Sequence, residues 1–300
     1  MTIFRGVVTA TESLSPELVR VTLGGPGVAD FVSTGVPDEY VRVFFPHGDD
    51  PHDVSLPVPD GDWWSTPPGA PEAPMRTYTI SAVRPAAGEI DIDFVVHEAG
   101  IAGPWARTAQ PGYVLGLNAP TGLYEPPNGT RWQLLAADLT GLPAAARIAA
   151  RSTGIRTRLV LEAPAGAALV DLAVYGVAAG AGIEVTWIEG GNGHGPSALG
   201  EIVRRSLHEK GSFEEGYVWV AGETAALRDV RKFLRRELGL PAARYKVVGY
   251  WNPVADWSSR YDALSEDVQR ELAAIWDDAE PGDAEDTQLR YEERLAQLGL

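Results

Sequence analysis

The sequence predicts two domains of different class: an N-terminal antiparallel β-barrel and a C-terminal α/β domain with a parallel sheet, followed by a short helical acidic tail. Up to about residue 125, apolar residues come in short alternating or β-branched runs between glycine- and proline-rich turns, which is typical of antiparallel strands. From about residue 130, strand-like runs alternate with longer helical segments, the pattern of a parallel sheet covered on both faces. We therefore expect domains at 1–125 and 130–251 and an extension at 252–300.

The first domain carries several short strands with turns between them, which favours a small barrel. Strands are expected at residues 7–10, 18–23, 40–45 and 90–97. The stretch from Pro46 to Pro74 holds eight prolines and little periodicity, so it is expected to be a long loop. Its Trp63-Trp64 pair fits two roles, a cover over a binding site or an anchor that holds the loop on the barrel.

The second domain follows an expected linker at residues 125–129 (Glu-Pro-Pro-Asn-Gly). Its strands are expected at residues 132–137, 157–161, 183–188, 217–221 and 245–248, and its helices at 143–152, 168–178, 198–209 and 225–238. The last helix has one apolar stripe, formed by Leu227, Val230, Leu234 and Leu238. Thr224 is expected to be its N-cap and Gly239 its C′ residue.

The extension is strongly acidic. Residues 262–300 hold 12 acidic and three basic side chains, so −9 of the chain's net charge of −16 lies there. Four apolar residues share one helical face: Leu264, Val268, Leu272 and Ile275. Ser265 is the candidate N-cap of this helix. Pro281-Gly282 is expected to break this helix before a shorter last one. We expect an amphipathic appendage that packs on the body of the protein or on a second subunit.

Composition excludes several classes of function. The net charge of −16 argues against nucleic acid and anionic membranes as partners. The absence of cysteine excludes disulfides, thiolate metal sites and thiol nucleophiles, and the five scattered histidines predict no permanent metal site. No run of 18 apolar residues and no charged-then-apolar leader is present, so we expect a cytoplasmic protein without membrane insertion.

Residues 76–79 read Arg-Thr-Tyr-Thr at the end of the β-rich half. In an extended segment alternate side chains point the same way, so Arg76 and Tyr78 share a face. A flavin needs a cation for its phosphates, a flat aromatic against its ring, and a hydroxyl or amide near the ring edge. Arg76, Tyr78 and Thr79 supply these in that order. The same four residues also fit an ordinary half-exposed strand.

The strand at 90–97 is followed by residues 98–107 (Glu-Ala-Gly-Ile-Ala-Gly-Pro-Trp-Ala-Arg). A strand followed by glycines and a helix start lets backbone N–H groups face a pyrophosphate, and Pro104 suits a first helical turn. His97 is placed to contact the flavin; the alternative is a strand-end histidine without a role, but its position beside the other motifs favours the contact.

These motifs resemble the siderophore-interacting protein family, FAD-dependent ferric-chelate reductases built like ferredoxin reductases. The resemblance implies an FAD-binding first domain, an NAD(P)H-binding second domain, a ferric siderophore as substrate and a monomer or homodimer. Hydride would pass from NADH or NADPH to the flavin and electrons then singly to iron, with no catalytic side chain because the flavin carries the chemistry. The resemblance to the family covers roughly residues 1–251. Besides the motifs above, it rests on the segments 111–117, 120–122, 132–144, 217–223 and 249–251.

The resemblance also implies site residues. In the FAD half they are Arg76, Thr77, Tyr78, Thr79, Val95, His97, Ala102, Gly103, Trp105, Ala106 and Thr121. In the nicotinamide half they are Asp138, Thr140, Gly222, Glu223 and Trp251. Ligands in open α/β sheets bind beyond the carboxyl ends of strands, which is where Asp138, Thr140 and Gly222 are expected. Thr79 and Thr140 would lie near the flavin ring, although Asp138 or Thr140 also fits a helix N-cap.

The chain departs from the family pattern at several positions. Gly103 stands where a serine is common, Leu139 and Gly141 replace two residues after Asp138, and Asn252-Pro253 replaces Arg-Gly. Two alternatives therefore stay open: a reductase of the same fold with another electron acceptor, and a flavin- or chelate-binding protein without turnover.

Nucleotide preference is a further expectation. Glu189 ends a strand where the family commonly has a basic residue, and an acid there accepts hydrogen bonds from ribose hydroxyls and repels a 2′-phosphate. Together with the lost arginine at Asn252, this favours NADH over NADPH, although Glu189 also fits a solvated strand end. The glycine-rich residues 190–195 lack the Gly-x-Gly-x-x-Gly spacing and are expected to be a flexible surface loop.

Overall fold

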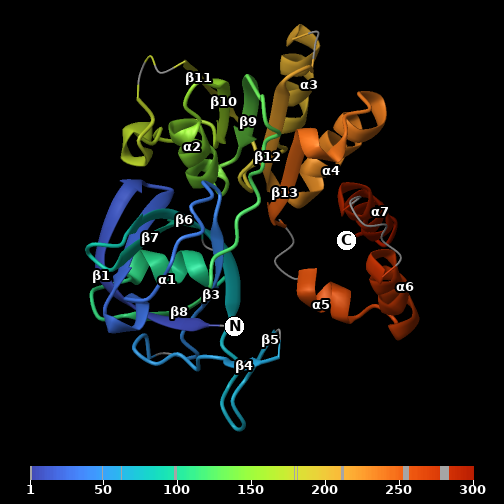
Figure 1. The fold of residues 1–300 in the computed structure, drawn as a ribbon. Helices are drawn as coiled ribbons and strands as arrows, with labels where there is room; N and C mark the ends of the chain where they lie inside the picture. The colour runs from blue at the N-terminus through green and yellow to red at the C-terminus, as the bar shows by residue number, and fades with distance from the viewer. Residues whose placement is uncertain are drawn as a thin grey trace. The chain divides into compact units, whose positions relative to one another are not determined.

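The computed structural model describes residues 2–48, 50–61, 63–97, 100–178, 180, 182–210, 213–252, 257–277 and 284–300 (Figure 1). The chain forms two compact units, each built from several segments. The first unit consists of Met1–Tyr124, Leu139–Thr153 and Gly166–Ala181, and the second of Glu125–Asp138, Gly154–Ala165 and Gly182–Leu300. The two units are therefore interleaved along the sequence.

The first unit contains a closed six-stranded antiparallel barrel, as predicted. Its strand order is β1-β2-β7-β6-β3-β8, with β1 (Ile3–Ser15), β2 (Leu18–Gly24), β3 (Tyr40–Phe44), β6 (Met75–Arg84), β7 (Glu89–Val95) and β8 (Val114–Asn118). Alternate side chains of these strands point inward and fill the core, where Val41, Ile80 and Ile92 are 0% exposed. A single 3₁₀ turn, η1 (Pro26–Val28), and the short helix α1 (Ala102–Thr108) pack on the barrel strands.

The long loop between β3 and β6 holds a two-stranded hairpin, β4 (Val58–Asp60) and β5 (Trp63–Ser65), which the sequence pattern does not reveal. The Trp64 ring packs edge-on against Phe44 at 5.6 Å, and the Arg42 guanidinium lies 4.9 Å from the centre of the Trp64 ring. These contacts favour the anchor role for Trp64; the side chain of Trp63 lies outside what the structure describes.

Helix α2 (Leu142–Arg151) and the 3₁₀ turn η2 (Leu172–Tyr175) complete the first unit. The prediction of a helix over residues 168–178 is wrong, because only this one turn forms. The Asp171 carboxylate accepts a hydrogen bond from the Ala173 N–H at 3.0 Å and so starts a turn in the middle of the segment. Gly176, at φ 85°, ends the turn in the left-handed conformation.

The second unit contains a five-stranded parallel sheet, as predicted, and its strand order is β11-β10-β9-β12-β13. Its strands are β9 (Trp132–Ala137), β10 (Arg156–Ala163), β11 (Ile183–Glu189), β12 (Gly216–Glu223) and β13 (Tyr245–Trp251). The chain runs outward from β9 to β11 and then returns to the other side of β9 for β12 and β13. The strand order therefore reverses between β9 and β12, the point at which open α/β sheets bind ligands.

Two helices of the second unit follow β11 and β12: α3 (Leu199–Lys210) and α4 (Thr224–Lys232), the latter continuing as the π-helical turn η3 (Phe233–Glu237). The 3₁₀ turn η4 (Ala242–Arg244) leads into β13. Gly239 has φ 63°, as its predicted C′ position requires. The N-cap prediction for Thr224 is wrong, because Thr224 is the first helical residue and its hydroxyl donates to the Trp251 carbonyl at 3.0 Å.

The extension forms α5 (Trp257–Asp262), α6 (Glu266–Asp277) and α7 (Ala284–Gln297), and Ser265 accepts a hydrogen bond from the Val268 N–H at the start of α6. The predicted break at Pro281-Gly282 lies outside the described residues. Helix α7 is fixed to α4 by the buried Arg231, whose guanidinium lies 3.2 Å from the Glu285 carboxylate and 2.5 Å from that of Glu292. Among the described residues, no helix combines the length and the apolar character that crossing a bilayer requires.

Candidate functional site

Strand β6 carries the Arg-Thr-Tyr-Thr motif opposite β3, where Arg76 pairs with Val43 and Tyr78 with Val41. Directly opposed residues in an antiparallel ladder share a face, so Arg76 and Tyr78 both lie on the side of the buried valines. Arg76 is exposed at the end of this face, whereas Tyr78 is half-buried. Thr77 and Thr79 lie on the other face, the former exposed and the latter 5% exposed.

The Tyr78 ring belongs to an aromatic cluster that also holds Trp105 of α1. The Tyr78 ring centre lies 4.5 Å from that of Phe94, which lies 5.7 Å from Trp105; Phe45 lies 5.6 Å from Trp105. Burial raises the pKa of the Tyr78 phenol, so Tyr78 stays protonated at neutral pH. Two aromatic residues that the sequence assigns to the flavin, 27 positions apart, thus share one cluster.

The residues present fit a flavin dinucleotide. The exposed Arg76 guanidinium donates only to the neighbouring Met75 carbonyl, at 2.7 Å, and forms no ion pair within the described part of the chain. The Trp105 Nε1 donor is buried without a hydrogen-bond partner among those residues. An unpaired cation suits a phosphate, and an unsatisfied buried donor suits an acceptor on a ligand.

The segment that joins β7 to α1 is closely packed. A Cβ on Gly103 would lie 2.5 Å from the His97 carbonyl oxygen, so only glycine allows α1 to approach the strand end. Ala102 and Ala106 point into the barrel core, which leaves their backbone as the part able to meet a ligand. The His97 side chain is exposed, and Glu98-Ala99 lie outside the described residues.

Two predicted residues lie at strand ends of the barrel. Val95 is the last residue of β7 and pairs with Leu18. Thr121 is exposed, and its backbone exchanges hydrogen bonds of 2.8 and 3.0 Å with Tyr40. Both positions are fixed by the backbone, so neither depends on its side chain for placement.

A buried ion pair beside strand β6, which carries residues 76–79, was not expected from the sequence. Arg147 of α2 donates to the Ile80 carbonyl and lies 3.0 Å from Glu39, with side chains 3% and 0% exposed. Strand β6 changes its neighbour from β3 to β7 at Ile80, with a register shift, and Arg147 supplies a donor to the carbonyl at this junction. The Glu39 carboxylate also accepts bonds from Ser33 and Thr34.

In the second unit, four of the predicted nicotinamide residues meet at the carboxyl edge of the sheet. The Trp251 indole donates to the Asp138 carboxylate at 2.7 Å, and a Cβ on Gly222 would lie 2.7 Å from the same oxygen. Burial and then the charge of Asp138 raise the pKa of the neighbouring Glu223. Neither Asp138 nor Thr140 caps α2, whose N-cap is Gly141 without a side-chain bond; Thr140 belongs to the first unit.

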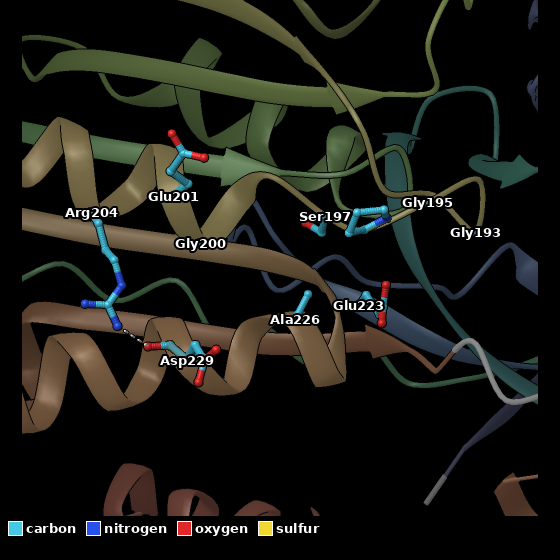
Figure 2. A pocket seen from close by; sticks show the side chains of 10 residues that line it. Gly193, Gly195, Ser197, Gly200, Glu201, Arg204, Glu223, Ala226 and Asp229 are labelled. Carbon is cyan, nitrogen blue, oxygen red and sulfur yellow. Dashed lines mark hydrogen bonds between the residues drawn. The ribbon is translucent and has the colours of Figure 1, made fainter.

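A cavity of about 630 Å³ opens beside these residues, between the segment 193–197 that precedes α3, the end of β12, and helices α3 and α4 (Figure 2). It is lined by Gly193, Gly195, Pro196, Ser197, Gly200, Glu201, Arg204, Glu223, Ala226 and Asp229. Of these, only Glu223 was predicted as a site residue. Such a location is where open α/β sheets receive nucleotides.

The glycine-rich segment 190–195 forms a loop whose residues 193–195 are exposed, as expected for a surface loop, and Gly193 and Gly195 also line the cavity, which the sequence did not indicate. It folds over the fully buried Glu162, which accepts hydrogen bonds from the Ser197 hydroxyl at 2.9 Å and from the Ala198 N–H. A Cβ on Gly191 would lie 2.2 Å from a Glu162 oxygen. In the sequence, the signal for this arrangement is a glutamate, Glu162, at the end of an apolar strand, together with the later glycine run 190–195, whose backbone can approach a carboxylate closely.

The structure resembles that of a ferredoxin NADP⁺ reductase from Neisseria gonorrhoeae, with a TM-score of 0.58 at 10% identity, over 84% of this chain and 100% of that chain. It also resembles a siderophore utilization protein from T. fusca, with a TM-score of 0.69 at 31% identity, over 84% of this chain and 93% of that chain. These likenesses define the class of fold, which is that of the ferredoxin reductases; the matches below add FAD binding and oxidoreductase activity.

Residues 7–124 match the family model of the siderophore-interacting FAD-binding domain, and residues 130–253 that of the siderophore-interacting protein. The chain belongs to the siderophore-interacting protein family, which confirms the resemblance. An uncharacterized protein of Mycobacterium tuberculosis is 35% identical over 264 residues, 81% of this chain and 88% of that protein. The NADPH-dependent ferric-chelate reductase of Escherichia coli is 28% identical over 251 residues, 82% of this chain and 91% of that protein.

Proposed function

We propose that the chain is an NAD(P)H-dependent, FAD-mediated reductase of ferric siderophores that releases ferrous iron in the cytoplasm. The observation that carries the proposal is strand β6 in a family-matched FAD domain: Arg76, which forms no ion pair among the described residues, shares a face with Tyr78, and Tyr78 clusters with Trp105 of α1. The relative named as a ferric-chelate reductase supports the acceptor class.

In this proposal the protein binds and orients, and FAD would supply the redox chemistry, two-electron uptake from the nicotinamide nucleotide and one-electron transfer to iron. Arg76 would hold a phosphate by a charge-assisted bond, and Tyr78 and Trp105 would contact the ring system. The backbone at 100–103 would meet the pyrophosphate. The functional domains follow the sequence: FAD binding in 1–125, NAD(P)H binding in 130–251, with 252–300 as an extension.

The nicotinamide nucleotide would enter the cavity between α3 and α4. The N–H groups at the first turn of the 12-residue α3 suit its pyrophosphate. Asp138 and Trp251 hold each other through their 2.7 Å hydrogen bond, and this pair would fix the sheet edge beside the nicotinamide. None of these residues has to donate or accept a proton in the electron transfers.

The test starts with the visible spectrum of the purified protein, which should show a bound flavin. Anaerobic addition of NADH or NADPH should bleach it, and a ferric siderophore should restore it while an Fe(II)-specific chelator develops colour. A protein that binds no flavin after incubation with FAD would overturn the proposal. A flavin that is reduced but never reoxidised by ferric chelates would favour another acceptor, the alternative that the changes at Leu139, Gly141 and Asn252 motivate.

The long loop is part of the same question. Replacing residues 46–74 with a short Gly-Ser linker should leave FAD bound and change the KM for ferric siderophores if the loop contributes to the substrate site. Unchanged KM values for several chelates would make the loop a structural insertion, in keeping with the anchoring contacts of Trp64.

A further inference from the structure

We propose that this chain selects NADH over NADPH, because acidic side chains line the nucleotide cavity and the arginine that faces it is engaged by Glu237. The inference rests on the proposed function, since it takes the cavity of the second unit as the nucleotide site. It differs from the expectation built on Glu189, which is exposed at the end of β11 and is not among the residues that line the cavity.

The charge of the cavity is the first argument. Three carboxylates line it, from the first turn of α3 (Glu201), the end of β12 (Glu223) and α4 (Asp229). Glu201 is paired with Arg205 on the next turn of α3, which leaves Glu223 and Asp229; Arg204 is the one cation among the described lining residues. A phosphate monoester carries nearly two negative charges at neutral pH, so the 2′-phosphate of NADPH would enter a site of its own sign.

The state of Arg204 is the second argument. Its two terminal nitrogens lie 2.9 and 3.0 Å from the two oxygens of Glu237, a bidentate pair. Its guanidinium also lies 4.3 Å from the centre of the Phe233 ring. Figure 2 shows the side chain reaching from α3 toward α4, where it donates to the Asp229 carbonyl at 3.5 Å.

These contacts leave a 2′-phosphate without a cation unless the Arg204–Glu237 pair opens. A 2′-hydroxyl has no such requirement, because it donates to a carboxylate, and Glu223 and Asp229 both lie on the cavity wall. The burial that raises the pKa of Glu223 does not prevent this, since a protonated carboxyl group still accepts through its carbonyl oxygen. The site therefore discriminates against NADPH in two ways: its carboxylates repel the 2′-phosphate, and Glu237 holds Arg204, the cation that would otherwise bind this phosphate.

The test is equilibrium binding of NAD⁺ and NADP⁺ to the FAD-loaded protein by titration calorimetry, which needs no turnover. We expect NAD⁺ to bind at least about tenfold more tightly than NADP⁺. Glu237→Gln frees Arg204 and should tighten NADP⁺ binding by roughly fivefold with little effect on NAD⁺, the effect of one exposed charge pair. Both partners are partly exposed, at 34% and 49% of their side chains, so the variant should fold.

Glu209→Gln is the matched control. It breaks another partly exposed pair, between Arg158 of β10 and Glu209 of α3 at 3.3 Å, and Glu209 does not line this cavity. It should change neither affinity. Equal or tighter binding of NADP⁺ by the parent, or equal effects of Glu237→Gln on both nucleotides, would overturn the inference alone. Failure of both nucleotides to bind would instead overturn the proposed function, and the inference with it.

Discussion

Replacing Arg147 with methionine removes the guanidinium that joins α2 to β6. The change leaves the Glu39 carboxylate without its charged partner and the Ile80 carbonyl without this donor. Both side chains of the pair are almost fully buried, so water does not screen the loss. Breaking such a pair costs about 3–5 kcal/mol, because a charge stays buried without compensation. For a domain of this size, that corresponds to a fall in Tm of roughly 10 °C.

The measurement is thermal unfolding followed by circular dichroism, with Arg131→Met as control. Arg131 and Glu215 are also 3.0 Å apart, but their side chains are 73% and 55% exposed. An exposed pair contributes at most about 1 kcal/mol, so the control should lose no more than a few degrees. Similar shifts in the two variants would refute the argument that burial decides the effect. The double variant Glu39→Gln, Arg147→Met should recover part of the loss, since it removes the uncompensated charge.

The same pair gives a pH dependence. Burial alone would raise the pKa of Glu39, but hydrogen bonds from Ser33, Arg147 and Thr34 outweigh it and lower the pKa. A carboxyl group whose pKa is lower in the folded state stabilises the protein above its unfolded pKa of about 4.3, and this stabilisation disappears as the pH falls through the folded value. The Tm difference between the parent and Arg147→Met should therefore shrink below about pH 4; a constant difference would contradict this assignment.

The remaining predictions concern Arg76 of β6, Gly103 of α1 and the extension. Arg76→Ala removes a charge-assisted phosphate contact and should weaken FAD binding roughly ten- to a hundredfold by equilibrium dialysis; unchanged affinity would exclude the assignment. Gly103→Ala forces a Cβ to 2.5 Å from the His97 carbonyl, so it should lower both Tm and flavin content, and a parent-like Tm would show that α1 can move away. Arg231→Met removes the cation that faces the buried Glu292 and leaves Glu285 with Lys246, 3.5 Å away, so α7 should become sensitive to limited proteolysis; parent-like resistance would count against the anchor.

The sequence predicts the layers and motifs well because these depend on local periodicity. The succession of short apolar runs and longer helical segments is enough to find all five strands of the parallel sheet along the chain. The segment 168–178 fails because its alanines favour a helix, whereas a single hydrogen bond from Ala173 to Asp171 and the left-handed Gly176 decide the outcome. Such competition between a side chain and the helical backbone has no periodic signal.

The candidate site likewise contains residues that the sequence identifies and residues that it does not. Residues 76–79 can be identified because one strand presents them with fixed spacing. Arg147 and Glu39 are 108 positions apart, and no pattern in either segment indicates that they meet. The ion pair of Arg204 with Glu237 is likewise a tertiary contact, between α3 and the turn after α4. The sequence shows that the domain contains an arginine, but it does not show whether this arginine is available to a phosphate.

The interleaving of the two units restricts how members of this family can be recombined. A chimera joined at the linker, residues 125–129, would take β3 and β6 from one parent and α2 from the other. Its barrel would then receive Glu39 and the Ile80 carbonyl from the first parent and whatever stands at position 147 from the second. A second parent without an arginine there would leave a buried carboxylate unneutralised in every such hybrid. Crossovers placed after α2, near residue 153, would keep that pair of partners together.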